Sequence, residues 1–109
     1  MMKKDEVTPA QAQTLVAKGA FLLDVRENDE WARGHVDGAH HIPLGELRSR
    51  MAELPANTEI VCMCRSGGRS AKAQALLEAL PKKGTVYNLA GGILQWVKDG
   101  LPMSGTAEE

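Results

Sequence analysis

The chain has 109 residues, of which 43% are hydrophobic and 25% charged, with a formal net charge of −1. These values are typical of one soluble globular domain that is long enough to bury a core. The balanced charge gives no support for nucleic acid or a membrane as partner, because both attract strongly basic surfaces. The only cysteines, Cys62 and Cys64, are too close in sequence to cross-link distant segments, which excludes a disulfide scaffold.

Helices and strands are predicted to alternate along the chain. Thr8 and Pro9 suit the start of the first helix, as N-cap and first helical residue, and Gly19 suits its end. Short apolar runs predict buried strands, and apolar residues at helical spacing predict helices. After the first helix, the sequence predicts a strand over 20–25, a short helix over 26–33, a strand over 40–42, a helix over 45–54, a strand over 59–63, a helix over 70–80, a strand over 85–89 and a helix over 93–98.

This alternation, with short connections, favours an α/β fold with a largely parallel sheet and helices on both faces. We expect a single domain over 1–109, with a core of about 7–102. Residues 103–109 lack apolar periodicity, and we expect them to form a frayed tail. The start of the chain has no apolar stretch, so we expect neither a secretory signal peptide nor a transmembrane segment.

Cys64 directly follows the predicted strand 59–63 and precedes the predicted helix 70–80. In α/β sheets, ligands bind at the carboxyl ends of the strands, so this position predicts a functional site. A helix amino terminus and nearby cations both lower the pKa of a thiol, and Arg65 and Arg69 flank the loop. We therefore interpret Cys64 as a nucleophile, against the alternative that it is a small buried apolar residue.

The loop after Cys64 has the composition of an anion-binding cup. Its glycines can adopt positive φ and turn successive backbone amides inward, and its serines add hydroxyl donors. Ser70 also suits the N-cap of the following helix. Cys62 lies within the strand among apolar neighbours, so we interpret it as structural. The expected binding residues around Cys64 are Arg65, Ser66, Gly67, Gly68, Arg69 and Ser70.

Three segments together resemble the rhodanese family. The first comprises LDVR (23–26), EW (30–31) and GHVDGAHHIP (34–43), the second is CRSGGRS (64–70), and the third is NLAGGILQW (88–96). The resemblance covers roughly 7–102, and its strength lies in three motifs in the right order. It implies the rhodanese fold, with a twisted parallel sheet of about five strands flanked by helices.

The resemblance also implies a sulfurtransferase activity. The Cys64 thiolate would take the outer sulfur of thiosulfate or a similar anionic donor, form a persulfide, and pass the sulfur to cyanide or a thiol acceptor. Neither a metal nor an organic cofactor is expected, and a catalytic thiolate fits a reducing cytoplasm. We expect Asp24 to play a supporting structural role beside the site, by orienting loop amides or pairing with an arginine, for which Arg26 is a candidate.

Two other functions stay open at this point. Phosphatases and arsenate reductases of the same superfamily use similar anion loops with one more residue between the cysteine and the arginine. Here four residues separate Cys64 from Arg69, which favours a cup for a single sulfur atom. The other alternative is a sulfur-relay or regulatory module that is loaded by the persulfide of a partner protein.

Overall fold

The computed structural model describes residues 5–81 and 84–107. Within them, the helices are α1 (Pro9–Ala17), α2 (Asn28–Arg33), α3 (Gly68–Glu78) and α4 (Gly92–Lys98), and two short 3-10 helices are η1 (Leu44–Glu46) and η2 (Arg48–Glu53). The strands are β1 (Glu6–Val7), β2 (Phe21–Asp24), β3 (Gly34–His35), β4 (His40–His41), β5 (Ile60–Met63), β6 (Val86–Leu89) and β7 (Ser104–Gly105).

The main sheet has five parallel strands in the order β1-β6-β5-β2-β4, which confirms the predicted fold class. β5 lies at its centre and pairs with β2 on one side and β6 on the other. All four of its residues are buried, which explains why this strand is apolar on both faces rather than alternating.

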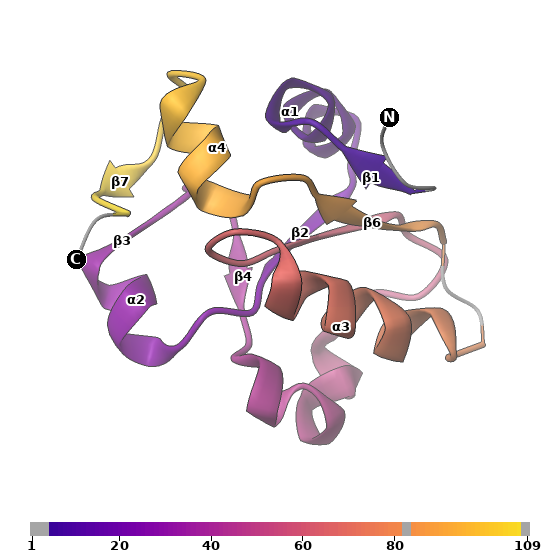
Figure 1. Cartoon of the computed structure of the whole chain (residues 1–109). Coiled ribbons are helices and arrows are strands. Elements are labelled where there is room, and N and C mark those ends of the chain that lie inside the picture. The colour runs from indigo at the N-terminus through magenta and orange to yellow at the C-terminus, as the bar shows by residue number, and fades with distance from the viewer. Residues whose placement is uncertain (1–4, 82–83, 108–109) are drawn as a thin grey trace.

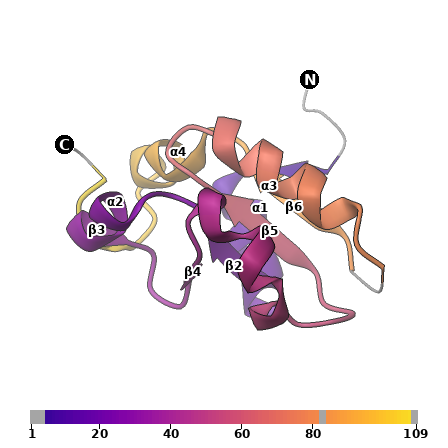
Figure 2. The same ribbon diagram turned by 90° about the horizontal axis from the view of Figure 1, so that it is seen from below.

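Helices cover both faces of this sheet (Figure 1). On one face, Ala73 and Leu77 of α3 and Leu47 and Leu54 near η2 pack against Cys62 and its neighbours. On the other face, residues of α1 and α4 pack against Val61, Met63 and the other inward side chains. Both views place α2, β3 and β7 together at one side of the molecule, away from α3 (Figure 2).

The first helix begins as the sequence predicts. The Thr8 hydroxyl accepts a hydrogen bond from the Gln11 amide, and the Gln11 side chain accepts one from the Thr8 amide, which forms a capping box. The predicted helix 45–54 is instead the two 3-10 helices η1 and η2, and η2 is kinked at Arg50, where φ is −120°. Arg50 there binds the carboxylates of Glu46 and Glu53.

Residues 103–107, which the sequence places in a frayed tail, have contacts with the rest of the fold, and 108–109 lie outside the described residues. Ser104 and Gly105 form β7, which pairs antiparallel with β3 in a second, two-stranded sheet. Met103 and Ala107 pack against the core cluster under α1 and α4. A strand of two residues is too short to show the apolar alternation from which strands are predicted. The sequence therefore gives no local signal for β7.

Candidate active site

Cys64 follows β5 at the carboxyl edge of the sheet, and only 1% of the residue is exposed. The loop that follows is exposed at Arg65, Ser66 and Gly68. The thiol therefore lies under a short loop at the point where the central strand ends and α3 begins.

The loop turns sharply at Gly67, which has φ +116° and is the N-cap of α3. That backbone conformation favours glycine, and it turns the Gly67 amide back toward the sulfur. The structure differs here from two sequence expectations. Gly68 does not need positive φ, and Ser70 is not the N-cap but lies inside the first turn of α3, fully buried.

The Cys64 sulfur is surrounded by hydrogen-bond donors. The Gly67 N–H donates to Sγ at 3.1 Å, and the Ser70 Oγ lies 3.3 Å from Sγ. Burial is the largest single influence on the Cys64 pKa and raises it. The Ser70 hydroxyl, when it donates to sulfur, and the backbone N–H groups of Ser70, Gly67 and Ser66 outweigh burial and lower the pKa of the thiol.

The amino end of α4 holds the loop through backbone hydrogen bonds. The Ile93 N–H donates to the Cys64 carbonyl at 2.8 Å, and the Leu94 N–H donates to the Arg65 carbonyl at 3.2 Å. Gly92 makes this approach possible, because a Cβ there would lie 2.4 Å from the Arg65 carbonyl oxygen. Gly92, the first residue of α4, thus lets the helix terminus lie directly against the reactive loop.

Arg69 is held by an acid from α2. Its guanidinium donates to both carboxylate oxygens of Glu30, at 2.6 and 2.9 Å. This hydrogen bond is the main reason that the pKa of Glu30 falls to about 2. The sequence predicts that the helix amino terminus and the arginines both lower the pKa of Cys64. In the structure the backbone N–H groups at the start of α3 contribute as predicted, whereas the Arg69 charge is paired with Glu30 and acts on the sulfur only electrostatically.

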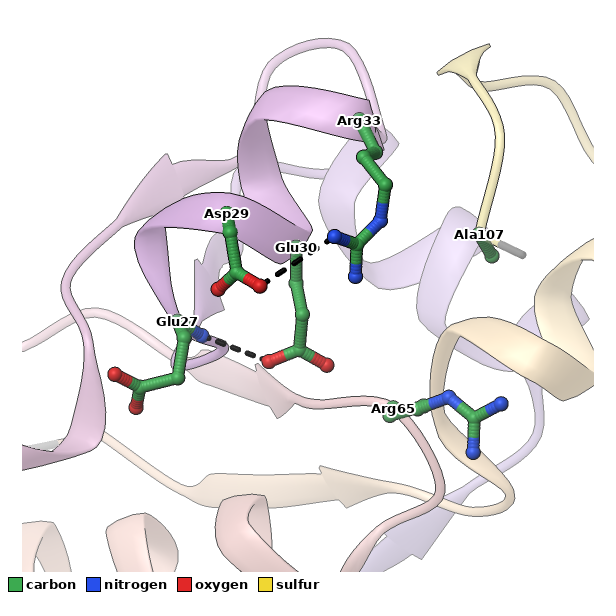
Figure 3. Close-up of a pocket in the computed structure, with 6 residues that line it drawn as sticks. All are labelled: Glu27, Asp29, Glu30, Arg33, Arg65 and Ala107. Carbon is green, nitrogen blue, oxygen red and sulfur yellow. Dashed lines mark hydrogen bonds and ion pairs between the residues drawn. The ribbon is translucent and has the colours of Figure 1, made fainter. Parts of the chain in front are cut away.

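A mixed-charge cavity of about 550 Å³ opens between α2 and the loop (Figure 3). The Glu30 carboxylate points from α2 toward the side of the cavity where Arg65 leaves the loop. The lining residues are Glu27, Asp29, Glu30, Arg33, Arg65 and Ala107. A second hollow, of about 270 Å³, lies over the loop itself at Ser66, Gly67 and Gly68.

Asp24 and Arg26 form a buried ion pair, with the Arg26 Nη2 2.9 Å from Asp24 Oδ2 and both side chains almost fully covered. This confirms that Arg26 is the arginine that pairs with Asp24. Arg26 also donates to the Gly34 carbonyl at 2.8 Å, and the His41 Nε2 donates to the Arg26 carbonyl at 2.7 Å. The pair therefore ties the end of β2 to β3 and β4.

Cys62 is fully buried, and burial raises its pKa to about 12. The raised pKa of Cys62 contrasts with the lowered pKa of Cys64 and agrees with a structural role for Cys62. Trp96 is buried in the core, whereas Trp31 stacks on the rings of His35 and His41 with centroid distances of 3.7 and 4.7 Å.

Sequence reasoning missed Asn88 of β6 as a site residue. Only 4% of Asn88 is exposed, and its side chain contacts both Ser70 and Gly67. The available signal was an amide at an inward position of an otherwise apolar strand, where a buried polar group needs partners.

In the described part of the chain, no three histidine, cysteine or acidic side chains are grouped so that they would hold a metal ion. Nor does any helix there have the length and apolar character that crossing a membrane requires.

The family model described as "Rhodanese-like domain" matches residues 8–99. A sulfurtransferase of Allochromatium vinosum is 40% identical over 83 residues, which are 76% of this chain and 77% of that protein. The putative sulfur carrier protein YrkF of Bacillus subtilis is 41% identical over 69% of this chain, but this chain spans only 40% of YrkF. Thiosulfate sulfurtransferase 18 of Arabidopsis thaliana is 34% identical, covering 94% of this chain and 85% of that protein.

A solved structure has the same fold. The rhodanese-related protein of Thermoplasma volcanium superposes with a TM-score of 0.82 at 29% identity, over 94% of this chain and 98% of that one. The relatives support a transferase of the rhodanese superfamily, with sulfur transfer as its general chemistry. The family match, the parallel sheet and the cysteine loop agree, and the chain belongs to the rhodanese-like domain family.

Proposed function

We propose that this protein transfers the outer sulfur of thiosulfate, or of a similar anionic donor, to a thiol or cyanide acceptor through a persulfide on Cys64. The observation that carries the proposal is the environment of the sulfur. A Gly67 amide donates to it, and hydrogen bonds lower the pKa of Cys64 against the effect of burial. A thiolate is the form that attacks sulfur.

In the first half-reaction, the Cys64 thiolate attacks the outer sulfur of thiosulfate. A new S–S bond forms, the S–S bond of the donor breaks, and sulfite leaves with the bonding electrons. The negative outer sulfur of the persulfide lies under the loop, where backbone N–H groups stabilise it. The donor reaches the loop from the side that is exposed to solvent, at Arg65, Ser66 and Gly68.

In the second half-reaction, the acceptor attacks the outer sulfur of the persulfide, and the Cys64 thiolate leaves as the free nucleophile. No electrons enter or leave the overall cycle. Two separate half-reactions predict ping-pong kinetics. The four-residue spacing between Cys64 and Arg69, and the pairing of Arg69 with Glu30, support a small sulfur cup over a phosphate site.

Mass spectrometry of the intact protein after thiosulfate treatment tests the proposal. We expect one added sulfur atom on the wild type and on Cys62→Ser, and none on Cys64→Ser. Addition of cyanide should return the loaded protein to its original mass. If Cys64→Ser gains the same sulfur, or if the wild type gains none, the proposal is wrong. Turnover of p-nitrophenyl phosphate would instead favour a phosphatase.

A sulfur-relay role is the second candidate, and the similarity to a putative sulfur carrier protein favours it. In that role the donor is the persulfide of a protein partner, and the same Cys64 chemistry applies. The two candidates differ in rate. The relay predicts slow loading from thiosulfate and fast loading from a protein persulfide, whereas the thiosulfate enzyme predicts the reverse order.

A further inference from the structure

Asn88 links the two groups that hold the Cys64 sulfur. Its side chain extends from β6, is almost fully buried, and donates from Nδ2 to the Gly67 carbonyl at 3.2 Å. Its Oδ1 lies 2.5 Å from the Ser70 Oγ. Gly67 and Ser70 are the same residues that contact the Cys64 Sγ.

The contacts of Asn88 determine which way its amide faces. A backbone carbonyl only accepts hydrogen bonds, so the NH₂ group of Asn88 must face Gly67. Its Oδ1 then faces Ser70, and a carbonyl oxygen also only accepts. The short contact between Ser70 and Asn88 is therefore a hydrogen bond that Ser70 donates.

A serine hydroxyl has a single hydrogen, and Ser70 has three acceptors within reach. They are the Asn88 Oδ1 at 2.5 Å, the Gly67 carbonyl at 3.2 Å and the Cys64 Sγ at 3.3 Å. The Gly67 carbonyl already accepts from Asn88, and the Asn88 oxygen is the nearest of the three acceptors. While Ser70 donates to Asn88, its Oγ offers only lone pairs to the sulfur.

We propose that Asn88 is a positioning residue that directs the Ser70 hydroxyl hydrogen away from Cys64 and so favours the protonated thiol in the resting protein. The chain of hydrogen bonds then runs from the Cys64 S–H to the Ser70 oxygen, and from the Ser70 O–H to Asn88. The inference rests on the proposed role of Cys64 as the nucleophile and adds a residue that controls when it ionises.

Ionisation of Cys64 reverses the role of Ser70. Once the thiol proton has left for solvent, the Ser70 hydroxyl stabilises the thiolate only by rotating toward it and giving up its bond to Asn88. Asn88 thus competes with the thiolate for one hydrogen. The Gly67 amide donates to the sulfur whichever way Ser70 points. Arg69 of α3 attracts the Cys64 thiolate, and the thiolate in turn raises the pKa of Cys62 in β5.

Titration of the thiolate absorbance in the ultraviolet tests this competition, with Cys64→Ser as the blank. Asn88→Ala frees the Ser70 hydroxyl to donate to sulfur, so we expect the apparent pKa of Cys64 to fall by about one pH unit. In the Ser70→Ala background there is no hydroxyl to redirect, so adding Asn88→Ala should leave the pKa unchanged. Asn88→Val, which suits a strand, replaces Asn88→Ala if the latter does not fold.

A rise in the apparent pKa of Cys64 in Asn88→Ala would overturn the inference. If Asn88 only holds the loop in place, its loss loosens the Gly67 amide and raises the pKa of Cys64, with or without Ser70. An unchanged pKa, or a fall that persists in the Ser70→Ala background, also contradicts the role. The matched control is Gln74→Ala, since the Gln74 amide also joins α3 to β6 but donates its hydrogen bonds to the Val86 and Asp5 carbonyls.

The titration requires no sulfur donor, so its result is separate from that of the thiosulfate experiment. A thiosulfate failure together with the expected pKa changes would reject the proposed donor and keep the role of Asn88. Normal loading with unchanged pKa values would reject the role of Asn88 alone.

Discussion

Glu30 is the residue through which α2 reaches the reactive loop. Its carboxylate accepts two hydrogen bonds from Arg69, while its own backbone carbonyl lies 3.5 Å from the Arg26 Nη1. The Arg69 guanidinium is thereby placed beside the loop rather than in bulk solvent. A two-point contact between partly buried groups is stronger than an ordinary surface ion pair.

The Glu30–Arg69 pair predicts a pH-dependent stability. The Glu30 pKa is about 2 in the folded protein and 4.5 as its ordinary value, so the unfolded chain binds the proton more tightly. The stabilisation is therefore complete above the ordinary value and disappears as the pH falls toward the folded value. We expect Glu30→Gln to cost about 1 kcal/mol near neutral pH, after allowance for solvent screening.

Urea unfolding of the wild type and Glu30→Gln across this pH range measures that cost. The difference in unfolding free energy should shrink between pH 4.5 and about 2. Asp29→Asn is the matched control on the same helix, because Asp29 is 73% exposed and pairs with Arg33 only at 3.4 Å. A Glu30→Gln cost that stays constant down to low pH would mean that the ion pair is not its source.

Two element termini meet at Cys64, and they act in different ways. The start of α3 directs the Gly67 amide at the sulfur, whereas the start of α4 holds the backbone carbonyls of Cys64 and Arg65. The first contact sets the chemistry of the thiol, and the second keeps the loop close to the sheet. Both depend on glycine at the turn, Gly67 before α3 and Gly92 at the start of α4.

Gly92→Ala should disrupt the contact between α4 and the loop. Gly92 has φ +62°, and the added Cβ would meet the backbone atoms of Arg65 and Cys64 at 2.4 to 2.6 Å. We expect a loss of about 3 kcal/mol of folding free energy, from left-handed strain together with overpacking, and slower loading of sulfur on Cys64.

Gly100→Ala separates the two contributions, because Gly100 has φ +79° with nothing within 4 Å of the added Cβ. This variant should show only the strain, about 1 kcal/mol, and load sulfur at the wild-type rate. Chemical denaturation and the mass-spectrometric loading assay measure both effects. Equal losses in the two glycine variants would show that close approach at Gly92 is unimportant.

At the scale of helices and strands, the sequence predicts the elements that have a regular apolar spacing. It does not predict individual side-chain contacts between elements. The positions of β2, β5, α3, β6 and α4 follow from apolar spacing, and Cys64 follows from the strand-to-helix transition. The bond between Ser70 and Asn88 and the bond between Arg69 and Glu30 join segments far apart in the chain. Side-chain partners of that kind are set by packing, so no local pattern in the sequence reveals them.

Over the whole molecule, the last described residues contribute to the cavity next to the loop. β7 pairs with β3, the Thr106 N–H donates to the Arg33 carbonyl at 3.0 Å, and Ala107 lines the cavity beside Arg65. The segment therefore holds the end of α2, from which Glu30 reaches Arg69. A region that looks like a tail in the sequence is part of the support for the site.

Deletion of residues 103–109 should lower the melting temperature by about 4–8 °C, the change that about 1 kcal/mol produces in a domain of this size. It should also speed amide exchange in β3, since β7 no longer pairs with it. Gly105→Ala is a second route to the same result, because its Cβ would lie 2.2 Å from the Arg33 carbonyl oxygen. Calorimetry and hydrogen exchange that are unchanged in both variants would contradict this role.

The place of β1 at the sheet edge has a consequence for how the chain folds. β1 comes first in sequence but pairs only with β6, near the other end, where the Asp5 carbonyl accepts from the Asn88 backbone N–H. Closing so long a loop costs entropy, so of the described strands in this sheet β1 waits longest in the chain for its neighbour. Until β1 docks, the outer edge of β6 is exposed and open to pairing with a second copy.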